Sequence, residues 1–154
     1  MFDHPDSALH ILEAIPMPSE RKDRENHALW CLLVTQAKYK QLMKIPSDSL
    51  IRIAYDYYKS TDNARRKAMA TLYMGCVNYD LENIEEAIQF YLDAKAEMEK
   101  TMDYKLGYLI MSGLGNIYLY LKSATTRLYD TEAKIICIVS KKGAQCIECH
   151  HKDI

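Results

Sequence analysis

The stretch Met74-Gly75-Cys76-Val77-Asn78-Tyr79-Asp80-Leu81 decides the fold of this chain, because a related stretch returns 40 residues later as Leu114-Gly115-Asn116-Ile117-Tyr118-Leu119-Tyr120-Leu121. A third copy lies 41 residues before the first quoted one, as Leu33-Val34-Thr35-Gln36-Ala37-Lys38-Tyr39. A fixed period of this length is typical of repeat proteins, in which neighbouring units bury each other's apolar faces. The sequence therefore predicts a short array of related units.

The segments around these copies have the periodicity of α-helices. Apolar residues recur every three or four positions, all four prolines precede residue 47, and the first glycine is Gly75. Long segments without proline or glycine favour helix. We predict N-caps at Ser47, Asp62 and Asn83, and helices over residues 8–15, 21–42, 50–57, 68–79, 84–100 and 103–121. Residues 135–139 suit helix or strand; we favour a seventh helix over residues 129–142, because it would complete a hairpin.

The overall composition excludes several classes of function. The chain has 154 residues, with 20 Lys and Arg against 21 Asp and Glu, so its net charge of −1 gives no support to binding nucleic acid. No apolar run approaches the roughly 20 residues of a membrane-spanning helix. Five cysteines, an odd number, argue against a disulfide framework. His4, His10 and His27 have no serine or acidic partner at usable spacing, so we do not expect an enzyme.

At the residues of the repeat, the chain resembles the tetratricopeptide-repeat (TPR) family. Leu114-Gly115 with Tyr118 matches the family's first helix, and Gly75 followed by Ala87, Tyr91 and Ala94 matches its pair of helices. Asn78 stands where an aromatic residue is usual, and Glu82 where the hairpin glycine is usual. The resemblance implies an all-α fold: a right-handed α-solenoid of about three helical hairpins, with six or seven helices, over residues 1–142.

Three further segments are similar to the repeat region of bacterial envelope sensor and lipoprotein-type proteins: Pro5-Asp6-Ser7-Ala8-Leu9, Thr35-Gln36-Ala37-Lys38-Tyr39 and Ser47-Asp48-Ser49-Leu50-Ile51. Those proteins carry a lipoprotein leader, a membrane helix and a DNA-binding end, none of which the sequence contains. An alternative function is therefore a fragment of an envelope-associated sensor or transcriptional regulator. The sequence predicts a cytoplasmic protein as it stands, or a periplasmic one if a leader precedes it.

The last residues, 143–154, form a tail that contains Cys146-Ile147-Glu148-Cys149-His150 and that we expect to be disordered. C-x-x-C-H is the spacing of c-type haem attachment, and Cys146, Cys149 and His150 are also of the types that bind zinc. No second well-spaced pair of ligands accompanies them. The expectation is a chain without metal or cofactor, and haem or metal binding through this tail is a distant alternative.

The resemblance places the first helix of each pair on a concave surface, where TPR-like proteins hold another polypeptide. Projecting the repeat frame onto that surface gives eight candidate partner-binding residues: Thr35, Lys38, Tyr39, Leu72, Cys76, Tyr79, Asn116 and Tyr120. Tyrosine, amide and aliphatic side chains suit a bound peptide or helix. Alternatively, some of these side chains pack against a terminal helix folded into the groove. The predicted function is a non-enzymatic protein-binding scaffold, and unpaired ends of the array make a homodimer plausible.

Overall fold

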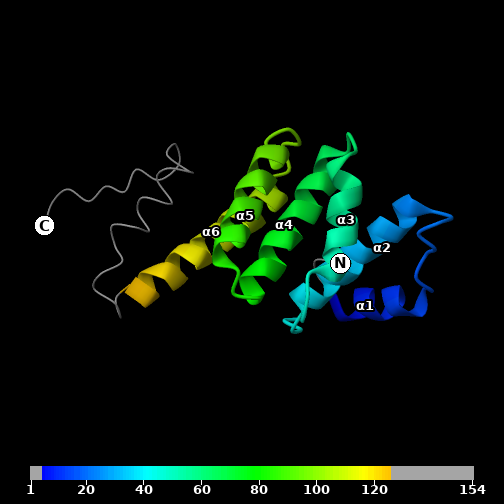
Figure 1. The fold of residues 1–154 in the computed structure, drawn as a ribbon, viewed down its shortest axis with the longest axis horizontal. Helices are drawn as coiled ribbons and strands as arrows, with labels where there is room; N and C mark the ends of the chain where they lie inside the picture. Colours follow the sequence, from blue (N-terminus) through cyan, green and yellow to red (C-terminus); the bar gives the residue numbers. More distant parts are fainter. Residues whose placement is uncertain (1–4, 126–154) are drawn as a thin grey trace, which may run out of the picture. The chain divides into compact units, whose positions relative to one another are not determined.

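The computed structural model describes residues 5–125, and over this range the chain is all-helical, with six helices and no strand (Figure 1). This confirms the all-α class. The predicted seventh helix and the tail lie outside the described residues. The chain divides into two compact units, residues 1–117 and 118–154, and α6 crosses their boundary. The helices are α1 (Pro5–Ala14), α2 (Arg24–Lys40), α3 (Ser49–Lys59), α4 (Ala64–Asp80), α5 (Ile84–Met98) and α6 (Tyr104–Thr125).

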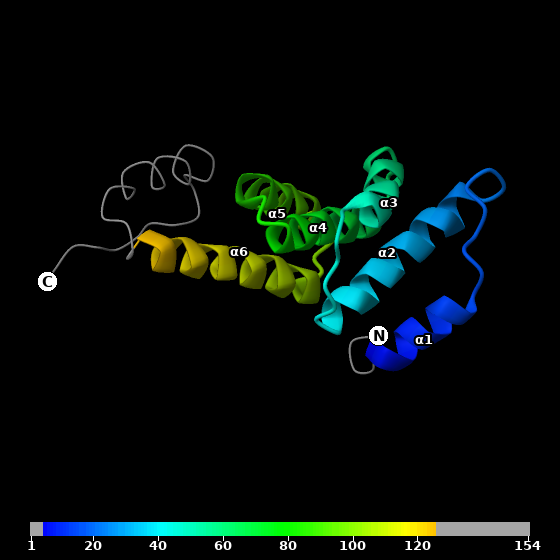
Figure 2. The same ribbon diagram turned by 60° about the horizontal axis from the view of Figure 1, so that its bottom comes forward.

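Within the first unit, each helix from α1 to α5 packs against the next, and α2 also contacts α4 (Figures 1 and 2). Leu9 and Leu12 of α1 form a buried cluster with Val34 and Ala37 of α2. Trp30 donates a hydrogen bond from its indole Nε1 to the carbonyl of Leu12, 3.1 Å away. An isolated helix of ten residues is only marginally stable in water, so α1 depends on the burial of this apolar stripe against α2.

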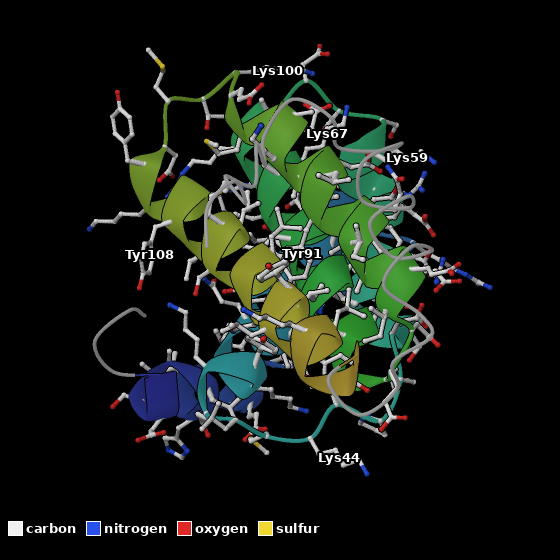
Figure 3. All side chains as sticks on the ribbon, turned by 90° about the vertical axis from the view of Figure 1, so that its left-hand side faces the viewer. Lys44, Lys59, Lys67, Tyr91, Lys100 and Tyr108 are labelled. Atoms are coloured by element: carbon white, nitrogen blue, oxygen red, sulfur yellow. The ribbon has the colours of Figure 1, made fainter. Side chains whose placement is uncertain are left out.

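Tyr91 of α5 organises the contact among α4, α5 and α6. Its ring lies against two glycines: a Cβ atom added at Gly75 would lie 3.2 Å from the ring, and one added at Gly113 would lie 2.4 Å from it. Figure 3 shows Tyr91 in the middle of the helices. Its hydroxyl donates to the Sγ atom of Cys76 at 3.3 Å, so its polar end is satisfied inside the core. The two glycines are therefore required for close approach of the helices.

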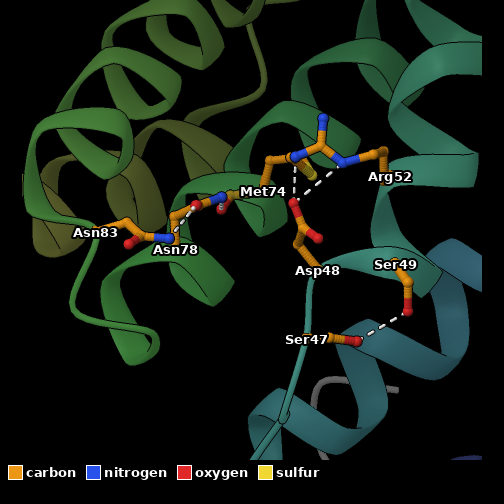
Figure 4. Close-up of polar contacts among 7 residues, drawn as sticks. All are labelled: Ser47, Asp48, Ser49, Arg52, Met74, Asn78 and Asn83. Atoms are coloured by element: carbon orange, nitrogen blue, oxygen red, sulfur yellow. Dashed lines mark hydrogen bonds and ion pairs between the residues drawn. The ribbon is translucent and has the colours of Figure 1, made fainter.

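Asn78 is a polar residue at a buried position near the end of α4. Its Nδ2 donates to the carbonyl of Met74 at 2.9 Å, and its Oδ1 accepts from Nδ2 of Asn83 at 3.2 Å (Figure 4). The backbone N–H of Asn83 also donates to the carbonyl of Asn78, at 2.9 Å. Because every one of these groups is paired, the polar side chain is tolerated in the core and ties the end of α4 to the start of α5.

Two of the three predicted N-caps were wrong by one residue. α3 has Asp48 rather than Ser47 at the N-cap, and α4 has Asn63 rather than Asp62, with Asn63 Oδ1 accepting from the N–H of Arg66 at 3.1 Å. Ser47 instead shares a hydrogen bond with Ser49 at 2.8 Å, while the Asp48 carboxylate pairs with Arg52 (Figure 4). Asn83 is confirmed as the N-cap of α5, although its side chain makes no capping bond.

Three turns after helices contain a residue with positive φ that is not glycine: Leu42 at 54°, Glu82 at 64° and Met102 at 55°. These residues follow α2, α4 and α5. The left-handed conformation lets the chain reverse directly after a helix, and glycine is the usual residue for it. Glu82, between α4 and α5, therefore adopts a conformation that glycine adopts more readily.

The basic run Arg65-Arg66-Lys67 at the start of α4 forms ion pairs within the chain. Arg65 pairs with Asp103 at 2.8 Å, Arg66 with Glu25 at 2.8 Å, and Lys67 with Glu97 at 3.5 Å. The three carboxylates belong to the residue before α6, to α2 and to α5. A single ion pair near the surface contributes little to stability, but together the three pairs connect the start of α4 to three neighbouring segments.

Candidate partner-binding surface

Two hollows open beside α2 and α4. The first, the Gln36 hollow, is lined by residues of α2, α4 and the beginning of α6: Gln36, Arg65, Met69, Leu72, Tyr73, Asp103, Lys105, Leu106 and Leu109. Gln36 is only 2% exposed, and its side-chain oxygen accepts no hydrogen bond from any described residue. A buried acceptor without a donor is costly, which makes this atom a group that a bound N–H could satisfy.

The second, the Tyr39 hollow, lies at the carboxyl ends of α2 and α4. It is lined by Tyr39, Leu42, Met43, Lys44 and Asp80. The side chains of the turn after α2 are unusually apolar for an open position: Leu42 is 93% exposed and Met43 is 43% exposed. The hollow therefore combines an apolar rim with one ammonium group and one carboxylate, a mixture that suits recognition of a peptide.

A pair of tyrosine rings stands between the two hollows. Tyr39, which lines the second hollow, meets Tyr73, which lines the first, edge to face with ring centroids 6.0 Å apart. The Tyr39 hydroxyl also hydrogen-bonds the thiol of Cys76. Burial raises the pKa of Cys76 to about 11, so this thiol stays protonated at neutral pH and acts as a hydrogen-bonding core group rather than a nucleophile.

Asp80 is the one acidic group of the Tyr39 hollow. Partial burial raises the pKa of its carboxyl above the ordinary value of 3.8. The pKa of Tyr39 is raised mainly by burial, and the negative charge of Asp80 raises it further. An anion held beside apolar surface costs free energy, and a cationic group of a partner would recover part of that cost.

The eight predicted binding residues lie in three different environments. Asn116 and Tyr120 are exposed, and Lys38, Tyr39 and Tyr79 are half-buried. Thr35, Leu72 and Cys76 are buried; Thr35 donates to the carbonyl of Cys31 at 2.9 Å. Leu72 nevertheless lines the Gln36 hollow, whereas Thr35 and Cys76 line neither hollow and make their contacts beneath the surface.

The structure brings Tyr39 and Cys76 together, and it adds residues that the sequence had not indicated: Gln36, Leu42, Met43 and Lys44. The available signal was the apolar pair Leu42-Met43 in a turn, where polar residues are usual. The predicted metal or haem ligands Cys146, Cys149 and His150 lie outside the described residues. Among residues 5–125, no group of three or more His, Cys, Asp or Glu side chains is placed to hold a metal ion.

Among the helices that the structure describes, none has the length and apolar character to cross a membrane. Comparisons with protein-family models, with curated proteins and with solved structures found no match to this chain.

Proposed function

We propose that this chain is a TPR-like α-solenoid module without enzymatic activity, and that it binds a protein or peptide along the first helices of its pairs. The observation that carries the proposal is the Tyr39 hollow, where the exposed apolar residues Leu42 and Met43 stand beside Lys44 and Asp80. Exposed apolar groups bordered by charges are typical of peptide-binding surfaces, since apolar contacts supply affinity and charges supply orientation.

The hollows suit a peptide that presents an apolar side chain flanked by a basic and an acidic residue. Leu42 and Met43 would cover the apolar side chain, and methionine adapts its shape to different partners. Asp80 would face the basic residue and Lys44 the acidic one. A peptide N–H reaching the Gln36 hollow would satisfy the acceptor of Gln36, which has no donor among the described residues.

Selection from a random peptide library on the immobilised full chain tests the proposal. Selected peptides are expected to be apolar with a basic residue, and their affinities can be measured by fluorescence anisotropy. Met43→Ser should weaken binding about tenfold, the equivalent of about 1.4 kcal/mol. Met17→Ser is the matched control, because Met17 is 47% exposed against 43% for Met43 and lies between α1 and α2.

Two results would contradict the proposal. One is a selection that yields no peptide with measurable affinity. The other is a set of peptides whose binding changes equally in Met43→Ser and Met17→Ser, since such binding would not depend on the Tyr39 hollow.

A further inference from the structure

The Gln36 hollow contains a buried amide of which only one half is paired. Burial raises the pKa of Tyr73, which also lines the hollow, and a hydrogen bond with the side chain of Gln36 lowers it. A hydrogen bond that favours the ionised phenol is one donated to it, so the amide nitrogen of Gln36 serves Tyr73. The amide oxygen of Gln36 is buried and accepts from no residue of the described range. A ligand of this hollow therefore has a hydrogen-bond acceptor to satisfy.

The hollow is small, and most of its wall is apolar. Met69 and Leu72 line it from α4, and Leu106 and Leu109 line it from α6. Its volume of about 40 Å³ exceeds the roughly 10–15 Å³ that one water needs, but it is far below the roughly 300–1,000 Å³ of a pocket for a drug-sized ligand. The hollow thus has room for the end of one side chain, with apolar atoms against the leucines and a polar group beside Gln36.

The charged residues of the hollow disfavour a cationic ligand. Arg65 pairs with the Oδ2 atom of Asp103 at 2.8 Å, and the N–H of Leu106 donates to the Oδ1 atom of Asp103 at 3.1 Å. Both oxygens of this carboxylate are therefore engaged, and Lys105 adds a second cation to the lining. A lysine or arginine side chain of a partner would meet two cations and no unpaired carboxylate among the lining residues.

A neutral primary amide is the side-chain group that meets these conditions. Its NH₂ group donates to the oxygen of Gln36, and its own oxygen accepts from the cationic side of the hollow. A carboxylate has no hydrogen to donate and would face the Gln36 oxygen as a second acceptor, while an apolar group would leave that oxygen unpaired. A hydroxyl also donates, but its single oxygen fills less of the hollow.

The Gln36 hollow and the Tyr39 hollow lie along the same sides of α2 and α4. Gln36 and Tyr39 are three residues apart on α2, which is nearly one turn. Tyr73 and Asp80 are seven residues apart on α4, which is two turns and about 10 Å along the helix. An extended peptide covers that distance in about three residues, at roughly 3.3 Å per residue.

We infer that the Gln36 hollow is a specificity pocket for the side-chain amide of glutamine or asparagine in a bound peptide, about three residues from the apolar residue held at the Tyr39 hollow. The inference rests on the proposed function, because both hollows would contact the same peptide. It adds a requirement that the Tyr39 hollow alone does not impose.

Three peptide libraries, selected on the immobilised full chain, test the inference. Each has random residues on both sides of a fixed central residue, which is glutamine in the first library, glutamate in the second and methionine in the third. The glutamine library should give the tightest binders, with an apolar residue enriched about three positions from the centre. Replacing the central glutamine of such a peptide by methionine, which has a similar shape, should raise the Kd about tenfold, as measured by fluorescence anisotropy.

Gln36→Met removes the acceptor from the chain while nearly keeping the size of the side chain. This variant should bind the glutamine and methionine peptides with affinities within about twofold of each other, because the hollow no longer contains the acceptor that distinguishes them. Gln89→Met is the matched control, since Gln89 is exposed on α5 and lines neither hollow. It should keep the tenfold preference. The peptide comparison on the wild-type chain does not depend on how either variant folds.

Equal affinities of the glutamine and methionine peptides for the wild-type chain would overturn the inference and leave the proposed function standing. A preference for glutamine that survives in Gln36→Met would also overturn it, because the amide would then be recognised elsewhere. An absence of binders in all three libraries would overturn both the inference and the proposed function.

Discussion

At the scale of the residue, the ring of Tyr91 leaves no space for a side chain at one glycine of α6, whereas another glycine of the same helix has space for one. Gly113 faces this ring, and an added Cβ atom would lie 2.4 Å from its Cε1 atom, whereas an added Cβ at Gly115 would meet nothing among the described residues. The ring cannot move away, because Gly75 supports its other side and Cys76 accepts from its hydroxyl. A one-methyl change thus tests whether this contact is as close as described.

We expect Gly113→Ala to lower the free energy of unfolding by about 1–3 kcal/mol through overpacking. Gly115→Ala should raise it by up to about 1 kcal/mol, because alanine favours helix over glycine. Urea unfolding followed by circular dichroism measures both. Equal effects of the two substitutions would show that the Tyr91 ring is not held between the helices.

At the scale of the element, the turns after the helices store backbone strain that the sequence does not reveal. Glu82 has a φ of 64° in the turn between α4 and α5. This conformation destabilises the folded chain by about 1–2 kcal/mol when the residue is not glycine. A glycine avoids that strain but loses about 0.5–1 kcal/mol more conformational entropy on folding. Glu82→Gly should therefore raise the free energy of unfolding by up to about 1 kcal/mol.

Glu86→Gly is the matched control for that change, because Glu86 is an exposed glutamate in the first turn of α5 with an ordinary helical backbone. There the same substitution should lower the free energy of unfolding by about 1 kcal/mol, since glycine is a poor helix former. The two variants, compared by thermal unfolding, should shift the midpoint in opposite directions. A loss of stability in both would mean that Glu82 contributes a side-chain interaction larger than its backbone strain.

Much of the helical architecture could be predicted from the sequence, because apolar periodicity and the absence of glycine and proline act locally. The predicted helix at 84–100 is α5 at Ile84–Met98, and the one at 21–42 is α2 at Arg24–Lys40. The N-caps were less predictable. Ser47 and Asp48 are both good capping residues, so their types alone do not decide which of them is the N-cap of α3. In the structure Ser47 bonds to Ser49 and Asp48 pairs with Arg52.

The candidate site was harder to predict than the helices. Thr35, Leu72 and Cys76 were predicted on the concave surface; all three are buried, and of these only Leu72 lines one of the two hollows. Leu42 and Met43 were missed because they lie in a turn, beyond the helical periodicity on which the projection relied. Surface residues supplied by turns depend on the path of the chain between helices.

At the scale of the whole molecule, the stability of the fold should depend on pH through Asp80. Its pKa in the folded chain is raised above 3.8 by burial, so folding disfavours the ionised form. The contribution of Asp80 to the free energy of unfolding is then most favourable in acid, where Asp80 is protonated in both states. It falls as pH rises from 3.8 through the raised pKa, and the deficit persists at neutral pH.

Asp80→Asn removes this deficit. The variant should be more stable than the wild type at neutral pH, and the difference should vanish in acid, as measured by urea unfolding over a series of pH values. Asp23→Asn should behave in the opposite way, because the N–H and side chain of Asn26 hold the pKa of Asp23 below its usual value. Its carboxylate stabilises the start of α2, and that contribution is lost as pH falls.

The same Asp80→Asn variant connects stability with the proposed function. If Asp80 faces the basic residue of a bound peptide, the substitution should weaken binding about tenfold at neutral pH while it stabilises the fold. A carboxylate that lowers stability and raises affinity is expected of a binding residue, because the partner supplies the cation that the fold does not provide. Increased stability with unchanged affinity would instead assign Asp80 no part in recognition, and the Tyr39 hollow would then rely on Leu42, Met43 and Lys44 alone.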